Sequence, residues 1–363
     1  METTAEIRKR GSFPAIDLVR FVCALLVIGI HVYPFGNNGD PLLTELNFLT
    51  QVWLGRICVP FFLVCTGFFL FRQGDAMAFP GEKVRNCAKK LLRLYLLWTL
   101  LYFPLILREI ILLPGQPLGV GLLKFFRNFF FAGSYYHLWY LQAGLVAVGL
   151  VGLLLSRGIR LKRILPVAAV LFLAGLLPQT YFGILMRLRE RLPLVWKVWE
   201  VYEVLFVTTR NGLFEGFLYV ALGAWFAGNH SRPSVKGAAI GFVVSMALAL
   251  AELLTVRRLR WLNECDLFLF QVPSTCFLFC MACRIRGNGS PLWPHLRHLA
   301  NISYFLHVWV MKLLAAVFPV LGVDVTIPGV HFLSTAAVTL LLAEGLLRLQ
   351  KKPRFAFLGR IYG

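Results

Sequence analysis

Three side chains that could carry out acid–base and phosphate chemistry lie in the first hydrophobic segment of the chain: Asp17, Arg20 and His31. Ionisable groups are costly in hydrocarbon, so in such a segment they usually face a protein interior or a polar cavity. On a helix, Arg20 and His31 share one face and lie roughly 16 Å apart along the axis. Asp17 lies on the same face and can pair with Arg20. The segment therefore offers a guanidinium that could bind phosphates near its start and an imidazole that could transfer a proton near its end.

Two further arginines lie within apolar stretches of the sequence. Arg56 either extends its charge to the membrane surface or faces the same cavity as His31, where its charge could stabilise an oxyanion. Arg210 and Glu215 either form a structural ion pair or bind substrate, and Glu203 is another possible partner of Arg210.

Two more pairs could line a substrate site. His137 and Trp139 open an apolar segment, where they either belong to an aromatic belt at the membrane surface or contact substrate. Ser303 and His307 share a helix face and could form an activated nucleophile, although a helical serine more often bonds its own backbone. None of the eight cysteines is accompanied by metal-ligand spacing, so we expect no metal site.

The elements that position these side chains are predicted to be membrane helices. The chain has 363 residues, of which 58% are hydrophobic, and its mean hydropathy is +0.72. The apolar residues form blocks of about twenty, the length that spans a bilayer. The sequence therefore predicts an all-α, polytopic bundle with about ten helices in a single integral membrane domain, residues 1–363. The expected segments are 14–35, 47–71, 91–113, 136–156, 164–184, 209–228, 237–254, 266–283, 300–320 and 329–349.

The formal charge of +20 does not indicate nucleic-acid binding, because the Lys and Arg residues lie between the apolar blocks. One set of loops holds 23 of them, including Arg8, Lys9 and Arg10, and the opposite set holds 9. The positive-inside rule then predicts a multi-pass protein of the cell membrane with both termini cytoplasmic. Arg257, Arg258 and Arg260 fall on the outer side, where they either face anionic headgroups or mark an error in the segment count. We expect the first segment to remain as a membrane helix and not to be cleaved as a signal peptide.

An ordered set of short motifs resembles the acyltransferase-3 family of integral membrane acyltransferases. The motifs are Asp17-Leu18-Val19-Arg20 with His31 after ten residues, Arg56-x3-Pro60-Phe61-Phe62 with Thr66-Gly67-Phe68, His137-Leu138-Trp139-Tyr140-Leu141, and Ser303-Tyr304-x2-His307. The stretch from Thr209 to Phe214 is also similar to the membrane half of vancomycin-resistance serine racemases, whose racemase domain has no counterpart in this sequence. Thr66 departs from the serine found in many members.

The resemblance implies transfer of an acyl group, usually acetyl from acetyl-CoA, to a carbohydrate or another surface molecule. Together with the residues, it predicts His31 as the general base, Arg20 as the ligand of the CoA pyrophosphate and Asp17 as the group that orients Arg20. The acyl-CoA is a donor substrate, and we expect no permanently bound cofactor. The expected partners are membrane lipids, acyl-CoA and a glycan acceptor, and the oligomeric state is left open. The alternative is a permease for a small amino acid such as serine.

Overall fold

The chain forms two compact units in a computed structural model. The described residues are 13–36, 39–72, 80–228, 232–285, 287 and 289–363. Arg8, Lys9, Arg10 and Arg286, which entered the loop charge count, lie outside them. The first unit comprises residues 1–61, 232–246 and 273–363, and the second comprises residues 62–231 and 247–272.

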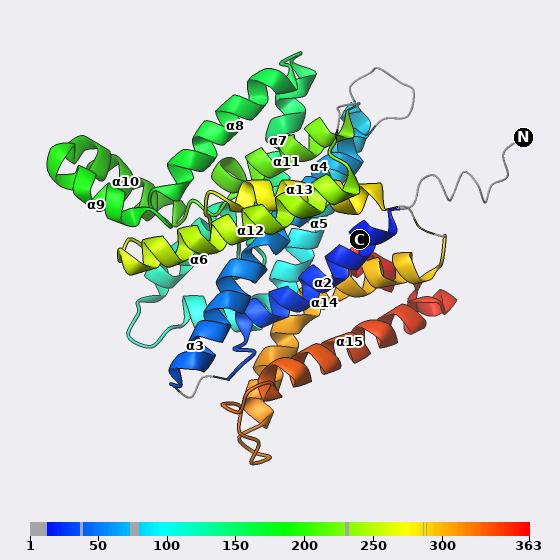
Figure 1. Ribbon diagram of the computed structural model, residues 1–363. Coiled ribbons are helices and arrows are strands. Elements are labelled where there is room, and N and C mark those ends of the chain that lie inside the picture. The colour runs from blue at the N-terminus through cyan, green and yellow to red at the C-terminus, as the bar shows by residue number, and fades with distance from the viewer. Residues whose placement is uncertain (1–12, 37–38, 73–79, 229–231, 286, 288) are drawn as a thin grey trace, which may run out of the picture. The chain divides into compact units, whose positions relative to one another are not determined.

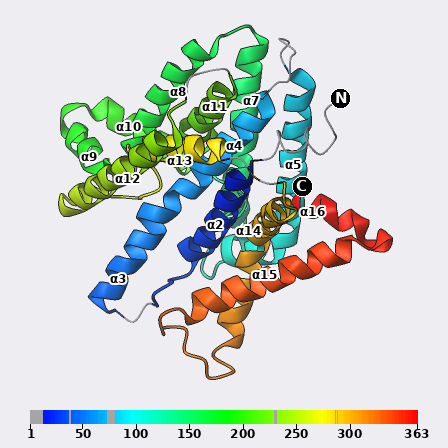
Figure 2. The same cartoon turned by 45° about the vertical axis from the view of Figure 1, so that its right-hand side comes forward.

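The first unit is built around α2 (Pro14–His31), which packs along α14 (Leu292–Val317). α15 (Val330–Gln350) packs on α14. In Figures 1 and 2, α2 is dark blue, α14 is orange and α15 is red. Pro14 favours the start of α2 because its fixed backbone angle suits the first helical turn. The unit also contains α3 (Pro41–Phe48), the π-helical turn η1 (Leu49–Leu54), the 3₁₀ turns η2 (Gly55–Ile57) and η5 (Pro353–Leu358), and α16 (Gly359–Tyr362).

The second unit is formed by helices from the middle of the chain. They are α5 (Gly81–Ile106), the π-helical turn η3 (Leu107–Ile111), α6 (Leu118–Phe131), α7 (Trp139–Ser156), α8 (Leu161–Leu176), α9 (Phe182–Arg191), α10 (Pro193–Phe206), the π-helical turn η4 (Gly212–Gly216) and α11 (Phe217–Ala227). The chain passes between the units within α4 (Cys58–Phe71), α12 (Val235–Arg258) and α13 (Gln271–Arg284).

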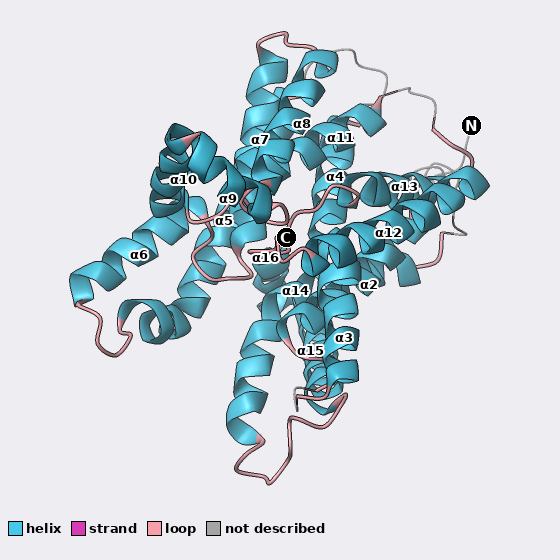
Figure 3. Ribbon diagram, turned by 60° about the vertical axis from the view of Figure 1, so that its left-hand side comes forward, coloured by secondary structure: helices cyan, strands magenta, loops and turns pink. Residues whose placement is uncertain are grey.

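The prediction of an all-α membrane bundle is confirmed. The described residues form helices and no strand (Figure 3), and seven of their helices are long and apolar enough to cross a membrane. All ten expected segments contain helix, but α8 and α13 have only 16 and 14 residues, and the apolar helix at 212–227 is also short. The sequence analysis missed α3, α6, α9 and α10, which lie in stretches it treated as loops.

Large apolar side chains are exposed on the outward faces of the long helices. Leu100 on α5 is 69% exposed, Val243 on α12 is 66% exposed and Leu341 on α15 is 72% exposed. A water-soluble surface would not carry so many such side chains, whereas hydrocarbon accommodates them. Together with the lengths of the helices, these faces identify a multi-pass membrane protein.

Two glycines let α4 and α11 approach closely within the second unit. A Cβ on Gly67 would collide with the carbonyl oxygen of Val220, and a Cβ on Gly223 would collide with that of Val64. Small residues at such a crossing bring helix backbones together in membranes. Gly67, from the Thr66-Gly67-Phe68 motif, therefore lets α4 lie close to α11.

Candidate functional site

The C-terminal end of α2 brings two histidines together in the first unit. The rings of His31 and His307 are stacked, with their centroids 5.3 Å apart and their planes inclined by 24°. His307 lies on α14 and is fully buried, whereas His31 is partly exposed. Both histidines were predicted as site residues, but they lie in separate segments. Residue spacing within one segment could not predict a contact between two.

The backbone of α14 fixes the tautomer of His307. Its Nδ1 lies 2.8 Å from the carbonyl oxygen of Tyr304 and 3.2 Å from that of Ser303. Because a carbonyl oxygen only accepts hydrogen bonds, Nδ1 must carry the hydrogen. In the neutral ring, Nε2 then has the lone pair and can act as a hydrogen-bond acceptor or base.

Ser303 does not form the side-chain contact that an activated nucleophile requires. Its Oγ is buried and has no hydrogen-bond partner within the described ranges, so it bonds neither His307 nor its own backbone. Neither alternative from the sequence analysis describes this hydroxyl, and a nucleophilic role for Ser303 has no support from the geometry.

The N-terminal end of α2 carries the predicted charged pair and a partner that the sequence analysis missed. Asp17 is buried, and its Oδ1 lies 3.6 Å from Arg297 NH1 on α14. Arg20 is close enough to Asp17 to attract its charge, as the spacing predicted. Two arginines therefore lie near one buried carboxylate. Arg297 had been counted only as a loop cation, because its helix begins several residues earlier than expected.

Arg56 lies in η2, which packs against α2 near His31. A Cβ on the preceding Gly55 would lie 2.6 Å from Cγ1 of Ile30, so glycine permits this close approach. The π-helical turn η1 precedes η2, and π-helical turns are frequent at functional sites. The structure thus places Arg56 in a turn that adjoins the end of α2 where His31 lies, and its role as an oxyanion ligand stays a prediction.

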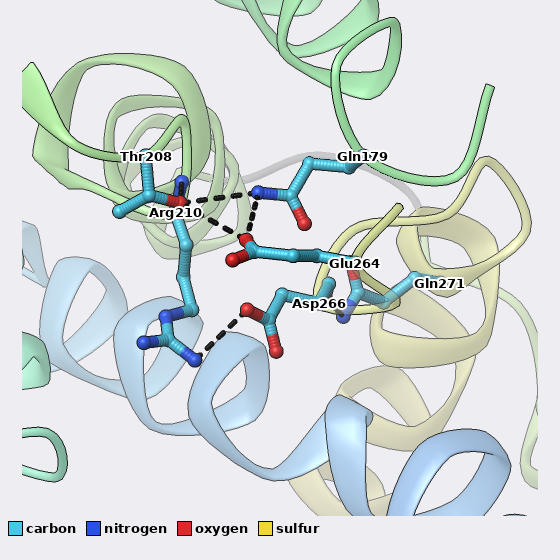
Figure 4. A network of polar contacts seen from close by, with 6 residues as sticks. All are labelled: Gln179, Thr208, Arg210, Glu264, Asp266 and Gln271. Carbon is cyan, nitrogen blue, oxygen red and sulfur yellow. Dashed lines mark hydrogen bonds and ion pairs between the residues drawn. The ribbon is translucent and has the colours of Figure 1, made fainter. Parts of the chain in front are cut away.

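A second polar cluster lies within the second unit, around Arg210 (Figure 4). Arg210 NH1 lies 2.8 Å from Asp266 Oδ2, and the guanidinium lies over the Trp139 ring at 5.0 Å from its centroid. Glu264 and the buried Glu215 also attract its charge. The ion pair with Asp266 was not among the sequence alternatives, since Asp266 is far away in the chain and spacing along one helix could not reveal it.

Further polar side chains extend this cluster. Gln179 Nε2 donates to Glu264 Oε2 at 2.9 Å and to Thr208 Oγ1 at 3.1 Å. Just before Thr208, Val207 has a φ of 71°, which is a strained conformation for a β-branched residue. Arg210 is thus held by an ion pair and a ring at the end of a strained turn. This supports a structural role, and substrate binding by Arg210, Glu215 and Trp139 stays a prediction.

His137 lies in a cage of tyrosines in the second unit. It is buried, and its ring packs edge-on against Tyr102, Tyr135 and Tyr136 at centroid distances of 4.6, 5.8 and 5.7 Å. Tyr135 donates a hydrogen bond to Glu109 Oε2 at 2.6 Å. Burial and this hydrogen bond raise the pKa of Tyr135 far above its ordinary value, so it stays a donor at neutral pH. The cage places His137 in a packed interior, and its contact with substrate stays a prediction.

The structure thus sorts the predicted residues into two groups. Asp17, Arg20, Arg56, His31 and His307 gather around α2 in the first unit, and His137, Trp139, Arg210 and Glu215 belong to the second. No group of three His, Cys, Asp or Glu side chains in the described part of the chain could hold a metal ion.

Comparison with known proteins gives one family and several relatives. The family model described as an acyltransferase domain, Acyl_transf_3, matches residues 13–347. A serine/alanine racemase of Enterococcus gallinarum is 29% identical over 324 residues, covering 88% of this chain and 41% of the relative. An amino-acid racemase of Enterococcus faecalis is 28% identical over 350 residues, covering 93% and 46%. The chain therefore spans less than half the length of these curated relatives. No solved structure matches.

Proposed function

The chain belongs to the Acyl_transf_3 family of acyltransferases, and from this membership we propose that it is a membrane O-acyltransferase. The proposed donor is a cytoplasmic acyl-CoA, acetyl-CoA above all. The proposed acceptor is a hydroxyl of an extracytoplasmic carbohydrate or other cell-surface molecule. The observation that supports this most strongly is the arrangement on α2, with arginines at one end and a stacked histidine pair at the other.

The charged end of α2 suits the phosphates of the donor. Arg20 presents a planar pair of donors to the pyrophosphate, and Asp17 holds its orientation. The neighbouring Arg297 adds a second positive charge. The distance along the helix, roughly 16 Å, lets the pantetheine arm carry the thioester from this end to His31.

The histidine end suits the transfer step. His31 takes the proton of the acceptor hydroxyl as its oxygen attacks the thioester carbon. A tetrahedral oxyanion forms, and Arg56 stabilises its charge. The carbon–sulfur bond then breaks, the CoA thiolate leaves, and it receives the proton from the His31 imidazolium. His307 packs against the His31 ring and holds it in place.

A permease for a small amino acid is the second candidate. The specific observation in its favour is that the curated relatives are named racemases of serine, alanine or amino acids. This chain covers less than half of their length, so the racemase names do not by themselves assign it an activity.

Labelled acetyl-CoA supplied to membrane vesicles from expressing cells tests the acyltransferase proposal. We expect the label to enter a hydroxyl ester on a surface glycan or related molecule, and to be released by mild alkali. Vesicles carrying His31→Ala are the control. Equal labelling of both preparations would contradict the proposal.

A further inference from the structure

Four hydroxyl groups among the described residues of the first unit are buried without a hydrogen bond: Thr275 on α13, and three on α14 and α15. Ser303, Thr335 and Thr339 are each 0% exposed, and none of their hydroxyl oxygens has a hydrogen-bond partner among the residues that the structure describes. Thr50 and Thr66 behave differently, because each donates to the carbonyl four residues earlier on its own helix, at 2.9 Å. Buried polar groups almost always have a hydrogen-bond partner, so we expect a partner for the hydroxyls of Ser303, Thr335 and Thr339.

The two threonines lie on the face of α15 that packs against the rest of the first unit. The buried residues of α15 recur every fourth position, from Thr335 through Thr339 and Ala343 to Leu347, and so form one stripe. α15 packs against α14, the 3₁₀ turn η5 and α2. Figure 2 shows α14 and α2 beside α15, and Thr335 and Thr339 belong to the buried stripe of α15.

Two contacts show how α15 is aligned against α14. His331 Nε2 lies 3.4 Å from the carbonyl oxygen of Met311, and His295 Nε2 lies 3.0 Å from Glu344 Oε2. The helices are thus antiparallel. Counting residues inward from His331 and Met311 along the antiparallel helices puts Thr335 level with His307 and Thr339 level with Ser303.

The hydroxyls lie between the two ends of the candidate site. At the histidine end, Phe332 is 3.6 Å from the position of a Cβ on Gly29, two residues before His31. At the other end, Arg297 of the Asp17–Arg297 pair follows His295 by two residues on α14. A polar line of Thr335, Ser303 and Thr339 thus runs from the stacked histidines toward the arginines.

We propose that Ser303, Thr335 and Thr339 hold the pantetheine arm of the acyl-CoA donor. This assignment rests on the proposed function. The arm carries two amides and a hydroxyl, and in a helix interface shielded from water each needs a partner. A serine or threonine hydroxyl both donates and accepts, so it can satisfy either side of an amide. An arm in this position joins phosphates near Arg20 to a thioester near His31.

Removal of the threonine hydroxyls at nearly constant volume tests the assignment. The double variant Thr335→Val/Thr339→Val should bind CoA about tenfold more weakly than the wild type, in isotherms on purified full-length protein. Adenosine 3′-phosphate 5′-diphosphate, which has all three phosphates of CoA but no pantetheine arm, should bind the variant and the wild type equally. Thr50→Val removes a hydroxyl that its own helix satisfies, and should leave both affinities unchanged.

A second variant guards against a folding defect. Thr335→Ser/Thr339→Ser keeps the hydroxyls and loses two methyl groups, so its affinity for CoA should stay near that of the wild type. Unchanged CoA affinity in the valine variant, or equal weakening for CoA and adenosine 3′-phosphate 5′-diphosphate, would overturn the assignment. Absence of acetyl-CoA binding to the wild type would instead refute the proposed function, and would be seen before any variant is made.

Discussion

At the scale of single residues, the account centres on His31 as the base that starts acyl transfer. His31 is the last residue of α2 and is partly exposed, so removing its ring leaves the buried face of the helix in place. We therefore expect His31→Ala to express and fold near normally and to lose transfer by about 10²–10⁴-fold. Release of labelled CoA from labelled acetyl-CoA, in membranes with equal amounts of protein, measures this.

A histidine elsewhere on the same bundle provides the control. His295 lies on α14, where its side chain is 43% exposed and pairs with Glu344. His295→Ala should retain transfer at close to the wild-type rate. Near-normal turnover by His31→Ala would remove His31 from the mechanism.

Site residues that lie on one helix could be predicted from their spacing. The residues that contact them from other helices could not. The spacing of Asp17, Arg20 and His31 placed all three on one face of α2. Arg297 and Asp266 could not be foreseen, because an ion pair between helices depends on packing and not on spacing within a segment. For the same reason the stacking of His31 on His307 required the structure.

At the scale of elements, the close packing of α4 and α11 depends on two glycines that no larger residue can replace. Gly67→Ala or Gly223→Ala should push α4 and α11 apart and cost about 1–3 kcal/mol of stability, because each new Cβ meets a backbone carbonyl. Thermal unfolding of the detergent-solubilised protein measures the loss. Gly149→Ala is the control, since a Cβ on Gly149 meets nothing within 4 Å, and a similar loss there would show that the effect is not one of helix approach.

The helices could be predicted from the sequence where a long apolar block marks them. Every apolar block forms helix, because a backbone in hydrocarbon must satisfy its own hydrogen bonds. The blocks did not reveal α6, α9 and α10, whose mixed apolar and charged residues read as loops. Nor did they reveal the π-helical turns η1 and η4, which depend on local packing.

At the scale of the whole molecule, the loop charges predict that both termini are cytoplasmic. With both termini cytoplasmic, a membrane-impermeant maleimide added to intact cells should label Val323→Cys and should not label Arg160→Cys. Both positions lie in loops between helices, and each substitution is made in a background without the native cysteines. Labelling of Arg160→Cys from outside would reverse the orientation.

The acyltransferase and the permease differ most clearly in whether the purified protein binds acetyl-CoA. The account predicts saturable binding by the wild type, weakened by about 1–3 kcal/mol in Arg20→Lys, because lysine keeps the charge but loses the planar pair of donors. Arg348→Lys should bind like the wild type, since Arg348 is 76% exposed and pairs with Glu344 within its own helix. A wild-type protein that binds no acetyl-CoA, while proteoliposomes containing it take up labelled serine, would contradict the acyltransferase account and favour the permease.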